Sequence, residues 1–134
     1  MLRIDGKEYE VSIEEIKVGR LINNGVEGYQ VRLFLEFYDE AGVNGYINLD
    51  GGYEMENDIS YFLNREYKGY NFEGGDYIYF EVFDTKKFLD SEIESEIKFS
   101  VNDMEDDYVY VSIDINDGLI DIKYDGKMNY IEVV

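Results

Sequence analysis

The sequence contains no cysteine, histidine, proline or tryptophan. Without cysteine there are no disulfides, zinc–thiolate sites or cysteine nucleophiles, an absence that fits a reducing compartment. Without histidine, serine triads of the usual kind are excluded, and the commonest general base and transition-metal ligand are missing. The chain also lacks a secretory signal at its start and any run of about 18 apolar residues, the length a membrane helix needs. We therefore expect a cytoplasmic protein.

Acidic charge dominates the composition. The 134 residues include 31 Asp and Glu against 12 Lys and Arg, so the formal net charge is −19. Direct binding to nucleic acid depends on Lys and Arg that neutralise phosphates, and anionic membrane surfaces repel such a chain. The partners that fit are basic proteins, among them nucleases and other nucleic-acid-binding enzymes.

The apolar content shows that this acidic chain should nevertheless fold. Hydrophobic residues make up 45% of it and aromatic residues 16%, including 14 Tyr and 8 Phe, well above a disordered composition. The length suits one domain with a real core, and no Gly/Ser-rich linker divides it. We predict a single acidic domain over residues 1–134.

Alternation of apolar and polar residues predicts half-buried strands. Tyr9, Val11 and Ile13 share one face of the first strand, and the alternation breaks at Glu14-Glu15, which indicates a bulge or bend. Further strand candidates are 29–38, 46–49, 77–83, 93–101, 108–115, 119–124 and 128–133.

Turn and helix signals complete the expected fold. Three Asp-Gly pairs, a preferred type I′ hairpin turn, lie between alternating runs: Asp5-Gly6, Asp117-Gly118 and Asp125-Gly126. A cap at Asn57 and helical spacing of the apolar residues that follow predict one short helix near 57–67. The expected architecture is β-rich, all-β or α+β: an antiparallel barrel or sandwich of seven to nine short strands with that helix.

Carboxylates concentrate in residues 90–107, which hold eight acidic residues and one lysine. Glu92, Glu94 and Glu96 fall on the strand face opposite the apolar residues. Residues two apart on a strand are separated by roughly 6.6–6.8 Å, close to two phosphate steps along a DNA strand axis at about 6.8 Å, so this row can imitate phosphates. The alternative is an ordinary solvated strand face followed by an acidic hairpin loop.

Tyr108 and Tyr110 alternate with aliphatic residues and are therefore expected to face outwards beside the acidic segment. Tyrosine is enriched in protein interfaces, although it also favours strands and sheets buried on both sides. The predicted partner-binding residues are Glu92, Glu94, Glu96, Asp103, Glu105, Asp106, Asp107, Tyr108 and Tyr110.

No catalytic or cofactor motif accompanies these features. The oxygen-rich stretches 102–107 and 114–118 both fail the calcium-loop template, and the Gly-Gly pairs are not part of a phosphate-binding motif. A pair of acids suitable for a glycosidase arises by chance among so many carboxylates. We therefore predict no enzymatic activity, no cofactor and no metal site.

In overall composition the chain is similar to bacterial toxin-immunity proteins and to phage-encoded DNA mimics, including some anti-CRISPR proteins, which are often small, acidic and aromatic-rich. This resemblance implies a non-enzymatic inhibitor that neutralises a basic protein. Two alternatives remain open: a structural or accessory β-rich module that is acidic for solubility, and a carboxylate-based calcium or carbohydrate binder.

Overall fold

The structure is a computed structural model that describes residues 1–23, 25–38, 44–70, 78–83, 88–90, 96–116 and 121–132. Within these ranges the chain forms ten strands and a single 3-10 turn. The elements are β1 (Leu2–Ile4), β2 (Lys7–Asn23), β3 (Val26–Tyr38), β4 (Asn44–Glu54), η1 (Ile59–Tyr61), β5 (Arg65–Tyr70), β6 (Ile78–Phe83), β7 (Phe88–Asp90), β8 (Glu96–Glu105), β9 (Tyr108–Asn116) and β10 (Asp121–Tyr130).

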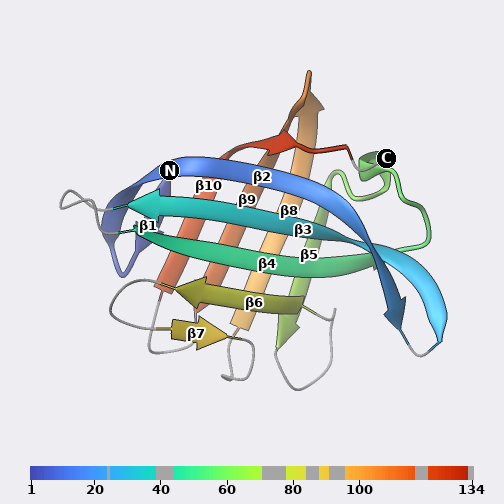
Figure 1. The fold of residues 1–134 in the computed structure, drawn as a ribbon, viewed down its shortest axis with the longest axis horizontal. Coiled ribbons are helices and arrows are strands. Elements are labelled where there is room, and N and C mark those ends of the chain that lie inside the picture. The colour runs from blue at the N-terminus through green and yellow to red at the C-terminus, as the bar shows by residue number, and fades with distance from the viewer. Residues whose placement is uncertain are drawn as a thin grey trace.

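All ten described strands belong to one sheet in the order β5-β8-β9-β10-β1-β2-β3-β4-β6-β7. The sheet curls back over itself, so that β2, β3, β4 and β6 cross in front of the steeper strands β8, β9 and β10, and β7 lies beside β6 (Figure 1). The predicted β-rich class is confirmed. The described strands outnumber the expected seven to nine, and β2 and β3 are long, with 17 and 13 residues.

Strand β2 carries the sheet from one layer to the other. Its first residues pair with β1, whereas the rest pair with β3. The register with β3 shifts between Val11 and Ile13, a bulge that lies just before the predicted break at Glu14-Glu15. Bulges bend a strand and increase its twist, which lets β2 follow both layers. Beyond the short β1, β10 pairs directly with β2 in parallel at Glu15 and Ile16.

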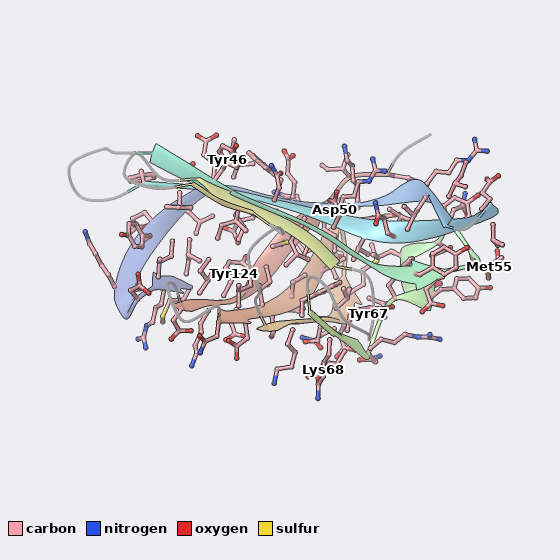
Figure 2. All side chains as sticks on the ribbon, turned by 90° about the horizontal axis from the view of Figure 1, so that it is seen from below. Tyr46, Asp50, Met55, Tyr67, Lys68 and Tyr124 are labelled. Carbon is pink, nitrogen blue, oxygen red and sulfur yellow. The ribbon has the colours of Figure 1, made fainter. Side chains whose placement is uncertain are left out.

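The core lies between the two layers. Figure 2 shows Tyr67 and Tyr124 between them, with Tyr46 on the outer side of one layer and Lys68 on the outer side of the other. Full burial of each large apolar side chain contributes roughly 1.5–3 kcal/mol. The largest fully buried side chains are Tyr124, Phe37, Phe62, Phe99, Leu2, Ile16, Leu35, Ile47, Leu49 and Ile115.

The helix predicted near 57–67 is reduced to the turn η1. Its cap is Asp58, whose carboxylate accepts a hydrogen bond from the Ser60 N–H at 2.9 Å. A helix cannot continue because β5 starts at Arg65 to pair with β8. That pairing places Tyr67 in the core, stacked on Phe99 at 5.1 Å between ring centroids. Tertiary packing therefore overrides the local helical spacing.

The three Asp-Gly pairs have different outcomes. Asp5 and Gly6 both have positive φ angles, 51° and 80°, and connect β1 to β2 as predicted. Asp117-Gly118 lies outside the described residues. The turn predicted at Asp125-Gly126 is wrong, because both residues lie inside β10 and pair with β9. The expected strands 119–124 and 128–133 accordingly merge into one continuous strand over the described residues.

Gly126 has a packing role in place of a turn. A Cβ at this position would lie 2.5 Å from the Tyr124 hydroxyl oxygen, so only glycine leaves room for that hydroxyl. The hydroxyl donates a hydrogen bond to the Glu14 carboxylate on β2. Burial, together with this bond, raises the pKa of Tyr124, so its hydroxyl stays protonated and links β10 to β2.

The Gly126→Ala variant is expected to lower the free energy of unfolding by roughly 1–3 kcal/mol, as overpacking does. The same substitution in a Tyr124→Phe background should cost less, because the oxygen that the new methyl group meets is gone. Urea denaturation of the four proteins measures this coupling. Equal costs in the two backgrounds would contradict the proposed packing.

Candidate functional site

The predicted acidic segment forms the tip of the β8–β9 hairpin. Glu105 pairs with Tyr108, which leaves Asp106 and Asp107 as the turn. Asp106 has a φ of 54°, in the left-handed region that Asp tolerates better than most residues. The side chains of Asp103, Glu105, Asp106 and Asp107 are all exposed. The hairpin therefore presents four carboxylates to solvent, two at the end of β8 and two in the turn.

Apolar and aromatic side chains accompany these carboxylates. Met104 is 38% exposed and Tyr108 is 42% exposed. The half-buried Tyr110 donates a hydrogen bond from its hydroxyl to Glu105 at 2.9 Å. The predicted alternation on β9 is confirmed, since Val109, Val111, Ile113 and Ile115 are buried. We call residues 103–110 the hairpin surface.

The ammonium of Lys127 on β10 contacts the rings of both tyrosines of the hairpin surface. Its ammonium lies 5.7 Å from the ring centroid of Tyr108 and 5.4 Å from that of Tyr110. Contact with the Tyr110 side chain, followed by the charge of Glu105, raises the pKa of Lys127. The ring faces attract the ammonium through their electrostatic quadrupole. The tyrosines are thus oriented by a neighbouring strand.

The remaining predicted residues are not part of this surface. Glu92 and Glu94 lie outside the described residues. Glu96 begins β8, where its backbone pairs with Tyr70 and Asn116. Glu96 and Glu105 lie at opposite ends of β8, about 30 Å apart along the strand, so Glu96 is far from the hairpin turn.

Among the described residues, no group of three or more acidic side chains is arranged to hold a metal ion. None of the helical structure in the described parts of the chain is long and apolar enough to cross a membrane.

A second polar cluster, which the sequence patterns did not single out, lies on the outer face of β2, β3 and β4. Lys17, Arg32 and Asp50 are directly opposite one another across these strands. The adjacent row is Glu15, Phe34 and Asn48. Each strand places these residues outwards because their neighbours in sequence face the core.

The guanidinium of Arg32 leans away from Asp50 and over β2. A Cβ on Gly19 would lie 2.4 Å from Arg32 Nε, so the absence of a side chain at Gly19 allows this approach. Arg32 Nη2 donates a hydrogen bond to the Arg20 carbonyl at 3.0 Å, while Nε is buried without a hydrogen-bond partner among the described residues. No ion pair of the described residues joins Asp50 to Arg32 or Lys17.

These side chains surround a hollow of about 430 Å³, which we call the sheet hollow. Its lining is Glu15, Lys17, Arg32, Leu33, Phe34, Asn48, Asp50 and Ile131. Burial raises the pKa of Asp50, and the charges of Arg32 and Lys17 offset this only in part. Ile131 forms one wall because its N–H bonds the Ile16 carbonyl, which holds the chain beside β2.

Comparison with known proteins assigns neither a family nor a function to the chain. No family model matches the chain, and neither a curated protein nor a solved structure matches it. The hairpin surface and the sheet hollow are therefore the basis for a functional interpretation.

The Asp50→Asn variant is expected to be more stable than the wild type at pH 7. A raised folded-state pKa means that ionised Asp50 is disfavoured in the folded protein relative to the unfolded chain. This cost is absent well below the unfolded pKa, where Asp50 is protonated in both states, and grows as pH rises. Denaturation at pH 3 and pH 7 measures the difference.

Asp103→Asn is the matched control, since it removes the same charge from an exposed position on the hairpin. A stabilisation that is equal for both variants, or that does not increase from pH 3 to pH 7, would refute the role of burial at Asp50.

Proposed function

We propose that the protein is a non-enzymatic inhibitor that binds a basic protein partner in the cytoplasm through its hairpin surface. The observation that carries this proposal is the combination of four exposed carboxylates with exposed Met104 and Tyr108 on one hairpin. A basic nuclease or another nucleic-acid-binding enzyme is the partner that fits this chemistry.

The composition of the hairpin surface supports protein binding over simple solubility. Interfaces combine an apolar or aromatic centre with a polar rim, and tyrosine is enriched among the residues that dominate binding energy. Charge at the rim mainly accelerates association with a partner of opposite sign. The acidic turn beside Tyr108 matches this arrangement, whereas acidity for solubility requires no neighbouring exposed aromatic ring.

The net charge of −19 supports a long-range contribution to the same process. Such a charge steers a basic partner towards the protein, and salt screens the effect with a Debye length of about 8–10 Å at physiological ionic strength. The hairpin then needs little backbone rearrangement on contact, because β8 and β9 pair with each other up to the turn and β9 also pairs with β10.

Removing the charge of three carboxylates on the hairpin surface is expected to weaken capture of the partner. The test variant is Asp103→Asn, Asp106→Asn and Asp107→Asn together, which keeps Glu105 as the acceptor for Tyr110. Wild type and variant are used as bait in host lysate at low salt, and bound proteins are eluted with a salt gradient and identified by mass spectrometry. The variant should release a stoichiometric basic protein at lower salt.

The matched control is Glu8→Gln, Glu10→Gln and Glu56→Gln, three exposed carboxylates on other parts of the chain. Control and wild type should elute alike. If the hairpin variant and the control release the partner at the same salt, net charge and not the hairpin governs binding. If no stoichiometric partner is captured, the proposal fails in favour of a structural module.

Competition with DNA and RNA then distinguishes two forms of inhibitor. A partner displaced by nucleic acid identifies a mimic that occupies a nucleic-acid groove. A partner that retains the protein in excess nucleic acid identifies an immunity-like protein that binds elsewhere on its target.

A further inference from the structure

The sheet hollow has the size and the charges of a small-molecule site, and the proposed function does not use it. Its volume of about 430 Å³ lies within the range of roughly 300–1,000 Å³ that is usual for ligand pockets. Its charged lining consists of two cations and two carboxylates: Lys17, Arg32, Glu15 and Asp50. Phe34 and Ile131 supply apolar surface beside them.

The cations and Asp50 lie on opposite sides of the hollow. Lys17 belongs to β2, and Arg32 is held over β2 by its contacts with Gly19 and the Arg20 carbonyl. Asp50 belongs to β4, two strands away from Lys17. Two strand spacings amount to about 9.6 Å between the backbones. Lys17 and Asp50 therefore flank β3, which carries Arg32, and no ion pair of the described residues joins them, while Glu15 lies on β2 beside Lys17.

We propose that the sheet hollow binds a small zwitterion, namely an α-amino acid with an apolar side chain. The ligand's carboxylate faces Lys17 and Arg32, its ammonium faces Asp50, and its side chain lies against Phe34 and Ile131. Glu15 and Asp50 would repel a ligand that carried only negative charge, and Lys17 and Arg32 would repel one that carried only positive charge. A ligand with both charges is complementary to both sides.

An α-amino acid brings both charges into one small space. Standard bond lengths place its amino nitrogen and a carboxylate oxygen about 3 Å apart.

The electrostatic environments of Arg32 and Asp50 also favour such a ligand. A buried N–H without an acceptor is costly, and Arg32 Nε is in this position among the described residues. A neighbouring carboxylate would lower the electrostatic cost of that guanidinium. On the other side, an ammonium would stabilise Asp50, whose partial burial disfavours its charge.

The test is an NMR titration of the full chain, which follows the backbone amides of residues 15–19, 30–34 and 47–50. The probes are L-leucine and L-phenylalanine, compared with N-acetyl-L-leucine, which lacks the ammonium, and L-leucinamide, which lacks the carboxylate. Either free amino acid should bind saturably below about 10 mM, and each analogue of leucine should bind at least about tenfold more weakly.

The proposal is overturned if neither amino acid binds saturably at these residues. It is also overturned if an analogue binds as tightly as leucine, because the site would then recognise a single charge. Asp50→Asn and Lys17→Met should each weaken binding by about tenfold or more, whereas the control Glu56→Gln, at an exposed position outside both surfaces, should leave it unchanged. These outcomes are independent of partner capture by the hairpin surface.

Discussion

Burial of one strand face between two layers of a single sheet, seen in every strand whose side-chain burial the structure describes, is the constraint on which the rest of this structure depends. The alternating sequence supplies an apolar face on β3, β4 and β9, and the bulge in β2 bends the sheet so that these faces meet. Because that face fills the core, most of the described acidic residues lie on outer faces and in turns, whereas Glu14 reaches the buried Tyr124 hydroxyl. A chain with a formal charge of −19 can therefore still hold a continuous apolar core.

Two glycines leave space for large side chains that pack closely against the backbone. Gly126 admits the Tyr124 hydroxyl, which reaches Glu14 on another strand, and Gly19 admits the Arg32 guanidinium. The second approach has a functional consequence. By drawing Arg32 over β2, it separates the guanidinium from Asp50 and leaves the sheet hollow between unpaired charges. The sheet hollow therefore depends on the packing of Arg32 against Gly19 of β2 as well as on the residues that line it.

The two surfaces differ in how their charges are organised. The hairpin surface projects carboxylates of one sign from a turn, together with Met104 and Tyr108, and this suits a large partner of opposite charge. The sheet hollow places charges of both signs around a small space on the opposite layer, and this suits a small ligand that carries both. The hairpin belongs to β8 and β9 and the hollow to β2, β3 and β4, and the two approach each other at Asn129 of β10, which pairs with both Tyr108 and Glu15.

Features of the chain that depend on local order were determined by the sequence alone. The alternation on β9 established which residues face inwards, alternation along the chain established the β-rich class, Asp5-Gly6 established a turn, and composition established the acidity. Non-local pairing decided the rest. Asp125-Gly126 lies within a strand because β9 pairs along its whole length, and the expected helix gives way because β5 must reach β8. Lys17, Arg32 and Asp50 meet only through strand register, which no local pattern encodes, because cross-strand contacts depend on which strands pair and how they align.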